Sequence, residues 1–227
     1  YFFTDTGFWD TLRCLFPLLN LVYPEMNEKM QEGLVNAYKE SGFLPEWASP
    51  GHRGCMVGNN SASVVADAYV KGIRGYDIET LWEAVKHGAD AVHPHVPSTG
   101  RLGWEWYNRL GYVPCDVGIN ESAARTLEYA YDDWCIYTLG KALGKPEEEI
   151  GVYKERAMNY RNLYRNDESL MSGRNADGAF SDNFSPLKWG GDFTEGNALH
   201  YTWSVFHDPA GLIALMGGDD AFNANLD

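Results

Sequence analysis

The stretch ESAARTLEYAYDDWCIYTLGKALGK, residues 121–145, decides the fold class. Its apolar side chains recur at helical spacing and form one broad face, which is typical of an amphipathic helix. The members of this face are Ala124, Leu127, Ala130, Trp134, Tyr137, Leu139 and Leu143. Gly144 is a natural C-cap, and PEEEIGVYKERAMNYRNLYR at 146–165 follows at once with three acids in its first turn. The two segments therefore predict an αα-hairpin.

Further helices are predicted on both sides of this hairpin. Their ends carry the usual signals: Pro24 and Gly42 bound one helix, Pro17 must lie at an end or a kink of another, and Asp208 is an N-cap followed by Pro209. These predicted helices cover residues 8–22, 24–42, 61–73, 77–92, 195–206 and 208–218.

Two long segments, 93–120 and 166–194, lack helical periodicity and are rich in Pro, Gly, Asn and Asp. Long loops that join paired helices usually carry function. The second loop could hold a short hairpin in 172–193, but no segment alternates as a longer strand would. We therefore predict an all-α fold of paired helices with long functional loops, forming part of an α/α toroid. An irregular helical domain is the alternative.

The composition narrows the class of partner. The formal net charge of −14 would repel the phosphate backbone of nucleic acid, which we exclude as a main partner. No run of residues is long and apolar enough to span a membrane. The four cysteines lack zinc-site spacing and are expected to be free thiols. Aromatic residues reach 14%, which suits either core packing or a sugar site, because pyranose C–H faces stack on flat rings.

Two N-terminal segments could contact a sugar. In GFWDTLR, Trp9 stands beside Asp10 and Arg13, which are three residues apart and can share one helix face. Stacking on the indole ring with hydrogen bonds to vicinal hydroxyls would hold a sugar, while a local ion pair is the simpler interpretation. In GHRGCMVGNN, residues 51–60, His52 could bind a hydroxyl group or be an ordinary surface loop histidine.

Carboxylates among aromatic residues are the candidates for acid chemistry. Glu195 has Trp189, Phe193, Tyr201 and Trp203 nearby in sequence. An apolar surrounding would let a carboxyl group hold a proton near neutral pH, as the general acid of glycoside cleavage must. Alternatively, Glu195 is an N-terminal helix acid that satisfies backbone N–H groups.

A second acidic pair, Asp132 and Asp133, lies in the middle of the strongest predicted helix. Burying carboxylates on a largely apolar helix is costly unless they are paired or face a cavity. A structural cap or salt-bridge role is the simpler interpretation of this pair.

Several segments together resemble the catalytic domain of glycoside hydrolase family 92, the calcium-dependent exo-α-mannosidases. They occur in the family's order and cover nearly all of the chain. The segments are GFWDTLRCLFPLLNLVYPE, MVGNNSASVVADAYVKGI, GYVPCDVGINESAARTLEYAYDDWCIYTLGKALGK, YKERAMNYRNLYR and WGGDFTEGNALHYTWSVFHDPAGLIALMGG.

The resemblance implies a fold and an activity. Family members join an N-terminal β-sandwich to an (α/α)6 barrel, so residues 1–227 would be the first part of that barrel, with the sandwich and the barrel's remainder outside this chain. Members remove terminal α-linked mannose, often α-1,2, from N-glycans or mannan with inversion. The partners would be mannose-containing glycans, and secretion or surface display follows from such large extracellular substrates.

The resemblance also implies roles for residues. The glutamate of the family's E-G-N-A motif is the general acid, which is Glu195 here; a subgroup that cleaves mannose-phosphate linkages has glutamine at this position. The W-D-x-x-R motif lines the pocket for the terminal mannose and corresponds to Trp9 and Asp10, with Arg13 as the third member. Many members read E-G-N-A-W-Q-Y where this chain has Leu199 and His200, and His200 joins His52 as a candidate substrate contact.

The chain also departs from the family pattern at its C-terminal end. The family's calcium ligands in an N-E-P motif and its general base in a G-N-D-D motif are expected beyond residue 227, so no metal ligand is assigned within this chain. The GGDDAF segment at 217–222 matches a different part of the family, and neither Asp219 nor Asp220 is taken as the base. Another α/α-toroid glycosidase and a non-catalytic carbohydrate-binding relative remain as alternatives.

Overall fold

A computed structural model describes residues 4–182 and 184–227. Its described part is mostly helical, and the strands found there are two residues long. The all-α class is therefore confirmed. The chain divides into two compact units, which are described separately: one runs to Trp104 and adds Asp132–Glu155, and the other comprises Glu105–Tyr131 and Arg156–Asp227.

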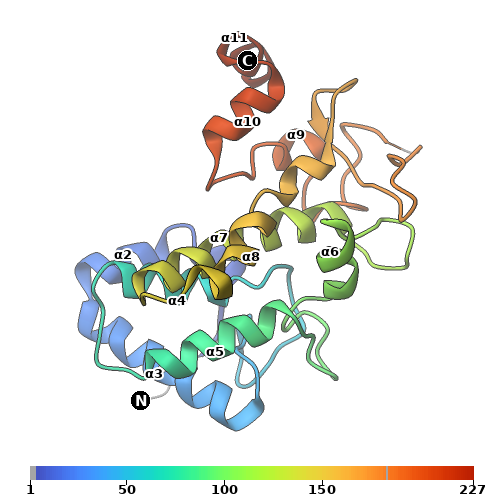
Figure 1. The fold of residues 1–227 in the computed structure, drawn as a ribbon. Coiled ribbons are helices and arrows are strands. Elements are labelled where there is room, and N and C mark those ends of the chain that lie inside the picture. The colour runs from blue at the N-terminus through green and yellow to red at the C-terminus, as the bar shows by residue number, and fades with distance from the viewer. Residues whose placement is uncertain (1–3, 183) are drawn as a thin grey trace. The chain divides into compact units, whose positions relative to one another are not determined.

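The first unit is built around four packed helices, drawn in blue to green in Figure 1. Helix α3 contacts both α2 and α5, and α4 also contacts both of them. Strands β1 and β2 pair antiparallel beside these helices. The elements that lie wholly in this unit are β1 (Thr6–Gly7), α1 (Phe8–Thr11), α2 (Leu15–Val22), α3 (Pro24–Ser41), β2 (Trp47–Ala48), α4 (Ser61–Val70) and α5 (Ile78–Ala89).

The second unit has shorter elements. Strands β3 and β4 form an antiparallel pair, β4 contacts α9, and α10 contacts α11. The elements that lie wholly in this unit are the 3-10 helix η1 (Asn159–Leu163), β3 (Tyr164–Arg165), β4 (Leu170–Met171), α9 (Ala198–Tyr201), α10 (Pro209–Met216) and α11 (Asp219–Leu226). Three helices extend across the division between the units: α6 (Trp104–Leu110), α7 (Ser122–Ala142) and α8 (Glu147–Arg156).

The predicted helix ends are confirmed where a proline, a glycine or a capping aspartate marks them. Pro24 opens α3 and Gly42 closes it with a left-handed φ of 79°. The Asp208 side chain accepts a hydrogen bond from the Gly211 N–H at 2.9 Å and caps α10. Gly144 follows α7 with a φ of 71°. Helices α7 and α8 follow one another as the hairpin prediction requires, but α8 ends at Arg156 and not at residue 165, and Asn159–Leu163 form the 3-10 helix η1.

Three further predictions need correction. The expected helix over 8–22 is two helices, with Pro17 in the first turn of α2, where its missing N–H costs nothing. The expected helix over 195–206 is only the four residues of α9, because Asn197 caps its start and the chain turns after Thr202. The loop 93–120 contains α6, which the sequence did not predict.

Buried polar groups tie the first unit together. Arg101 and Asp133 form an ion pair with Nη1 and Oδ1 2.7 Å apart, and both side chains are fully buried. The neighbouring Asp132 accepts a hydrogen bond from the Asn59 backbone N–H at 2.8 Å. The structural interpretation of the two aspartates is therefore confirmed.

A third buried acid, Glu46, precedes β2. It accepts hydrogen bonds from the Asn59 side chain at 2.9 Å and from the Ser61 N–H and hydroxyl at 2.9 and 2.6 Å. Burial raises the pKa of Glu46 to about 7, although these hydrogen bonds act in the opposite direction. The folded protein therefore holds a proton on Glu46 over a pH range in which the unfolded chain has lost it.

This raised pKa predicts that folding stability falls as pH increases from about 4.5 to about 7. Over that window the native state binds one more proton than the unfolded state, so the free energy of unfolding decreases by about 3 kcal/mol. Urea unfolding of the protein and of Glu46→Gln at several pH values would measure the difference. Glu40→Gln, at an exposed position of α3, is the control. Parallel pH profiles for the protein and Glu46→Gln would contradict the assignment.

Candidate functional site

A tight turn at residues 190–197 carries Glu195. The Gly190 N–H donates to the Gly196 carbonyl at 2.8 Å and closes the turn. The Tyr201 hydroxyl donates to the Thr194 carbonyl at 2.7 Å, and the N–H groups of Ala123 and Ala124 both donate to the Asp192 carbonyl at 3.0 Å. These bonds fix the turn to α9 on one side and to the start of α7 on the other.

Glu195 itself has an unusual backbone conformation. Its φ is +48°, in the left-handed region that residues with a side chain rarely occupy. Such a conformation typically costs on the order of 1–3 kcal/mol and persists only where the surroundings impose it.

The surroundings of Glu195 differ from the expectation. Its side chain is exposed in the described part of the chain, so the apolar enclosure inferred from the sequence is not found there. The neighbouring rings pack on other partners instead: Phe193 on Tyr201 at 5.3 Å between centroids, and Trp203 on Phe222 at 5.4 Å. The residues that are close in sequence therefore do not bury the carboxylate.

The helix-cap alternative for Glu195 is wrong. Asn197 is the N-cap of α9, and its side-chain oxygen accepts from the N–H groups of Leu199 and His200 at 3.1 and 3.3 Å. His200 completes the capping box, because its Nδ1 accepts from the Asn197 N–H at 3.3 Å. The His200 ring is exposed and lies edge-on to the exposed Trp189 ring at 5.8 Å. Glu195 is thus left outside the helix and free of any capping role.

Strand β2 of the first unit brings the two N-terminal candidate segments together. On one side it pairs with β1, which leads directly into α1 with Trp9 and Asp10. On its other side, Ala48 forms a bridge with His52. A Cβ atom on Gly7 would collide with the Trp47 ring, so only glycine allows this close approach.

Trp9 and Arg13 contact each other directly. The Arg13 guanidinium lies 4.7 Å from the centre of the Trp9 ring, a cation–π geometry. Asp10 is exposed, and α1 ends at Thr11, so Asp10 and Arg13 do not share one helix as expected. A half-buried ring with a cation on it and a carboxylate beside it is suited to stacking and hydrogen bonding of a sugar.

His52 belongs to a group of imidazole rings. Its Nε2 lies 2.8 Å from the Ser41 hydroxyl, and its ring centre is 5.1 Å from that of His93. Desolvation, and then the charge of His93, lower the pKa of His52, so its imidazole is neutral near pH 7. A neutral imidazole can exchange hydrogen bonds with a hydroxyl group, as the substrate-contact prediction requires.

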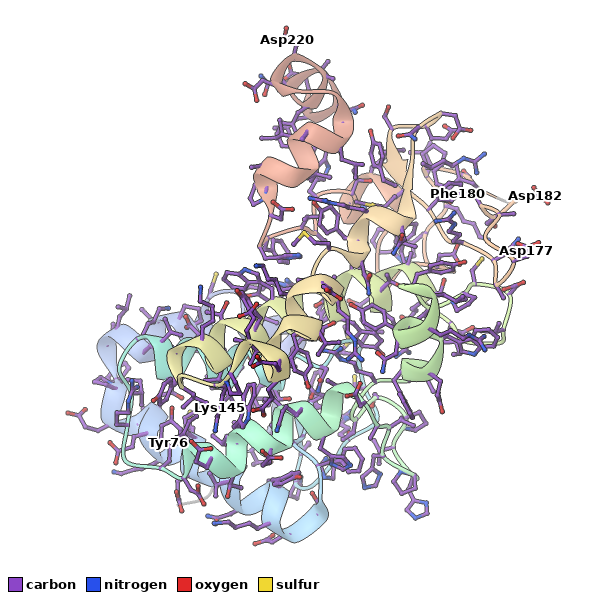
Figure 2. All side chains as sticks on the ribbon, viewed as in Figure 1. Tyr76, Lys145, Asp177, Phe180, Asp182 and Asp220 are labelled. Carbon is purple, nitrogen blue, oxygen red and sulfur yellow. The ribbon has the colours of Figure 1, made fainter. Side chains whose placement is uncertain are left out.

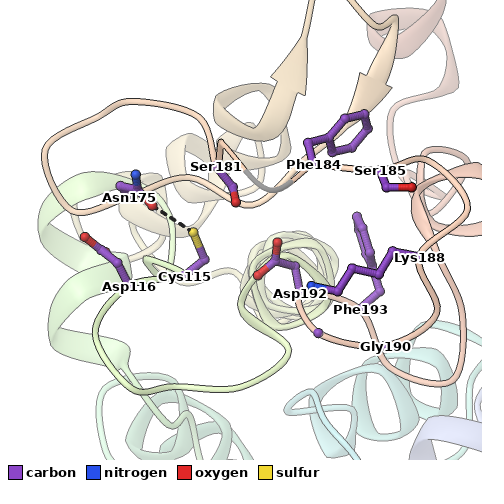
Figure 3. Close-up of a pocket in the computed structure, with 11 residues that line it drawn as sticks. Cys115, Asp116, Asn175, Ser181, Phe184, Ser185, Lys188, Gly190, Asp192 and Phe193 are labelled. Carbon is purple, nitrogen blue, oxygen red and sulfur yellow. Dashed lines mark hydrogen bonds between the residues drawn. The ribbon is translucent and has the colours of Figure 1, made fainter.

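A cavity of about 280 Å³ lies beside the turn that carries Glu195 (Figure 3). Its walls come from the second unit and comprise Cys115, Asp116, Asn175, Ser181, Phe184, Ser185, Lys188 and residues 190–193. The Asp192 carboxylate points into it, with the Lys188 side chain alongside. The sequence placed Asp192 three residues before Glu195 but gave no reason to assign it a role; the paired glycines before it were the available signal.

The described residues contain neither a metal-ligand cluster nor a membrane-spanning helix. Across residues 4–182 and 184–227, no three His, Cys, Asp or Glu side chains are grouped as a metal would require. No calcium ligand is therefore assigned among the described residues. In the same residues, no helix has the length and apolar character to cross a bilayer. The four cysteines are free thiols, as predicted.

Comparison with known proteins identifies the class. The model of the glycosyl hydrolase family 92 catalytic domain matches residues 1–227. The inverting family GH92 mannosidase BT2199 of Bacteroides thetaiotaomicron has 51% sequence identity and a TM-score of 0.96, over 100% of this chain and 30% of that protein. These matches define the catalytic domain of a glycoside hydrolase. The chain belongs to glycosyl hydrolase family 92, and the resemblance seen in its motifs is confirmed.

Two further relatives are more distant. The family GH92 α-mannosidase BT3965 of B. thetaiotaomicron, also solved with mannoimidazole, is 36% identical with a TM-score of 0.89, over 99% of this chain and 29% of that protein. An uncharacterized secreted glycosidase of Arthroderma benhamiae is 32% identical over 86% of this chain and 29% of its own length. The chain thus spans about 30% of the length of the relatives it matches.

Proposed function

We propose that the full-length protein containing this chain is an exo-acting α-mannosidase that removes terminal α-1,2-linked mannose from N-glycans or mannan. The observation that carries the proposal is the 51% identity, over the whole chain, with an inverting mannosidase. The mannoimidazole complex of a second relative supports mannose recognition, and a secreted relative supports secretion or surface display. Residues 1–227 would be the first part of an (α/α)6 barrel.

Glu195 would be the general acid. An exposed carboxyl group on a rigid turn can reach the glycosidic oxygen of a bound glycan and protonate it as the bond breaks. Inversion needs a second carboxylate to activate water on the opposite face of the sugar, typically about 6.5–9.5 Å away, and this base would lie outside the chain. Bound calcium, held by residues outside the chain, would polarise mannose hydroxyls.

The remaining candidates would hold the terminal mannose. The Trp9 ring offers a stacking surface, Asp10 can accept hydrogen bonds from two hydroxyls, and Arg13 adds donors over the ring. His52 and His200 can each exchange hydrogen bonds with further hydroxyl groups of the glycan. Holding the sugar in one orientation makes proton transfer to its glycosidic oxygen effectively intramolecular.

The test is an assay of the full-length protein on aryl α-mannoside and aryl α-glucoside. We expect selective hydrolysis of the mannoside, loss of turnover on chelation of divalent cations, and recovery on addition of calcium. Proton NMR during turnover should show β-mannose as the first product, because inversion changes the anomeric configuration. Preferential turnover of the glucoside would assign the protein to another group of toroid glycosidases. Binding of mannose without turnover would identify a non-catalytic relative.

A further inference from the structure

The hydroxyl group of Tyr201 holds the peptide unit that precedes Glu195. It donates to the Thr194 carbonyl at 2.7 Å, and this hydrogen bond is buried. Because a peptide unit is planar, an anchored carbonyl also restrains the direction of the Glu195 N–Cα bond. The torsion φ of Glu195 is the rotation about that bond, so its left-handed value of +48° is measured from an anchored plane. The hydroxyl thus acts directly on the backbone that carries the Glu195 side chain.

Tyr201 is itself anchored. It is the last residue of α9, and its N–H donates to the Asn197 carbonyl at 3.1 Å. The next residue, Thr202, ties the end of the helix to β4, because its hydroxyl accepts from the Met171 N–H at 3.0 Å. The Tyr201 ring is 6% exposed and packs on Phe193 at 5.3 Å between centroids. The hydroxyl is therefore presented from a rigid support.

The chain on the other side of Glu195 is anchored as well. The Gly196 carbonyl accepts from the Gly190 N–H at 2.8 Å, and the N–H of the same peptide unit donates to His200 Nδ1 at 3.3 Å. Gly196 also lies against the Tyr201 ring, since a Cβ atom there would approach ring atom Cε2 to 3.2 Å. The strained residue is thus held between two anchored peptide units, the kind of surrounding in which such strain persists.

A general acid depends on such precision. It transfers its proton only within hydrogen-bond reach of the glycosidic oxygen, about 2.6–3.2 Å between heavy atoms. A misplacement of about 1 Å can slow a reaction about a hundredfold. The Glu195 side chain is exposed, so packing restrains it little and its position depends on the backbone beneath it.

We propose that Tyr201 is a positioning residue: its hydroxyl holds Glu195 in the left-handed conformation and thereby directs the carboxyl group at the departing oxygen. The tyrosine acts through the backbone of Glu195 and needs no contact with the sugar. The consequence for catalysis rests on the proposed role of Glu195 as the general acid. The hold of the hydroxyl on the turn rests only on the contacts above, and it can be measured without turnover.

The first experiment compares two substrates in the full-length Tyr201→Phe variant, which keeps the ring and loses only the hydroxyl. α-1,2-Mannobiose needs a proton on its leaving group, whereas 2,4-dinitrophenyl α-mannoside releases a phenolate that leaves unprotonated. We expect kcat for mannobiose to fall by about tenfold to a hundredfold with KM little changed, and kcat for the aryl substrate to fall less than about twofold. A general loss of folded protein would instead lower both rates equally.

Tyr107→Phe is the matched control. The Tyr107 hydroxyl also donates to a backbone carbonyl, that of Arg156 at 3.1 Å, and its fully buried ring packs edge-on against Tyr129 at 5.5 Å. These residues belong to the same compact unit as Tyr201. Each variant therefore loses a hydroxyl–carbonyl hydrogen bond from that unit, and the midpoints of urea unfolding should fall similarly. Tyr107→Phe should leave the ratio of the two substrate rates unchanged.

A double variant tests whether Tyr201 acts through Glu195. Combining Tyr201→Phe with Glu195→Gln should slow mannobiose turnover no further than Glu195→Gln alone, because no proton remains to be positioned. Losses that multiply in the double variant would show that the tyrosine acts by another route. That outcome overturns the proposal, as does an equal fall of both substrate rates, or no fall, in Tyr201→Phe.

Hydrogen exchange of the full-length protein tests the hold on the turn independently of activity. In Tyr201→Phe, deuterium uptake by residues 186–197 should be about tenfold faster, since loosening of the turn exposes the Gly190 N–H. Tyr107→Phe should exchange in this segment like the unaltered protein. Helix α5, which begins just after Tyr76 in Figure 2, lies in the first unit and is the internal reference.

The exchange result separates this proposal from the proposed function. If the unaltered protein hydrolyses neither substrate, the mannosidase assignment fails, while faster exchange in Tyr201→Phe still shows that the hydroxyl fixes the backbone of Glu195. Unchanged exchange of residues 186–197 in Tyr201→Phe overturns the proposal whether or not the protein is a mannosidase.

Discussion

Replacing Glu195 with glutamine is expected to slow hydrolysis of α-1,2-mannobiose by about a hundred- to ten-thousandfold, the usual contribution of a general acid. Glutamine keeps the shape of the side chain but has no proton to transfer to the departing oxygen. Turnover of 2,4-dinitrophenyl α-mannoside should fall far less, because its phenolate leaves without protonation. The alkaline limb of the kcat/KM profile should also disappear in the variant, since that limb reports the essential acid. Steady-state kinetics of the full-length protein on both substrates would measure these effects.

The chain offers a matched control for this variant. Glu121 is also a glutamate in the left-handed region, with φ of +60°, in the same compact unit. Glu121→Gln should leave both rates and the pH profile unchanged, which separates loss of the acid from any effect of the strained backbone. Undiminished mannobiose turnover in Glu195→Gln would show that the acid lies elsewhere.

The second large effect concerns stability. Replacing Arg101 with methionine is expected to lower the free energy of unfolding by about 3–5 kcal/mol, because it leaves the fully buried Asp133 carboxylate without its ion-pair partner. Removing one partner of a buried ion pair leaves the other charge uncompensated, and neither side chain of this pair is exposed to solvent. Urea denaturation at constant pH would measure the change.

Two further variants test whether the loss of stability in Arg101→Met comes from the unpaired buried charge. The double variant Arg101→Met with Asp133→Leu removes both charges and should be more stable than Arg101→Met alone, as expected for apolar replacement of a buried pair. Lys39→Met breaks an exposed ion pair with Asp77 and should cost at most about 1 kcal/mol. If Arg101→Met is as mild as Lys39→Met, the buried pair does not stabilise the first unit as inferred.

The helices could be predicted where local chemistry sets their ends. Such signals lie within a few residues of the helix end that they mark. Examples are Pro24 at the start of α3, Gly42 after it, and the Asp208 cap of α10. Helix α6 was missed because its seven residues are too short for a periodic pattern to emerge. Likewise, α9 was predicted too long, because no glycine or proline directly after Tyr201 marks its end.

The candidate site was only partly predictable for a related reason. Family motifs located Glu195 and Trp9, but the burial of a carboxylate depends on which rings pack against which. Phe193 and Tyr201 pack on each other, and Glu195 stays exposed. Conversely, Glu46 lies in an unremarkable stretch and becomes buried through Asn59 and Ser61, more than ten residues away. Residues nearby in sequence thus predicted more burial for Glu195 than it has, and gave no sign that Glu46 is buried.

The left-handed backbone of Glu195 has a consequence for how this position changes over evolutionary time. At most positions, when a side chain loses its function, the backbone conformation does not favour any particular replacement residue. Here glycine and asparagine would each relieve strain, so a lineage released from selection for the carboxylate gains stability by adopting them. Such a substitution in a homologous gene would therefore mark a protein that has abandoned turnover while keeping its fold.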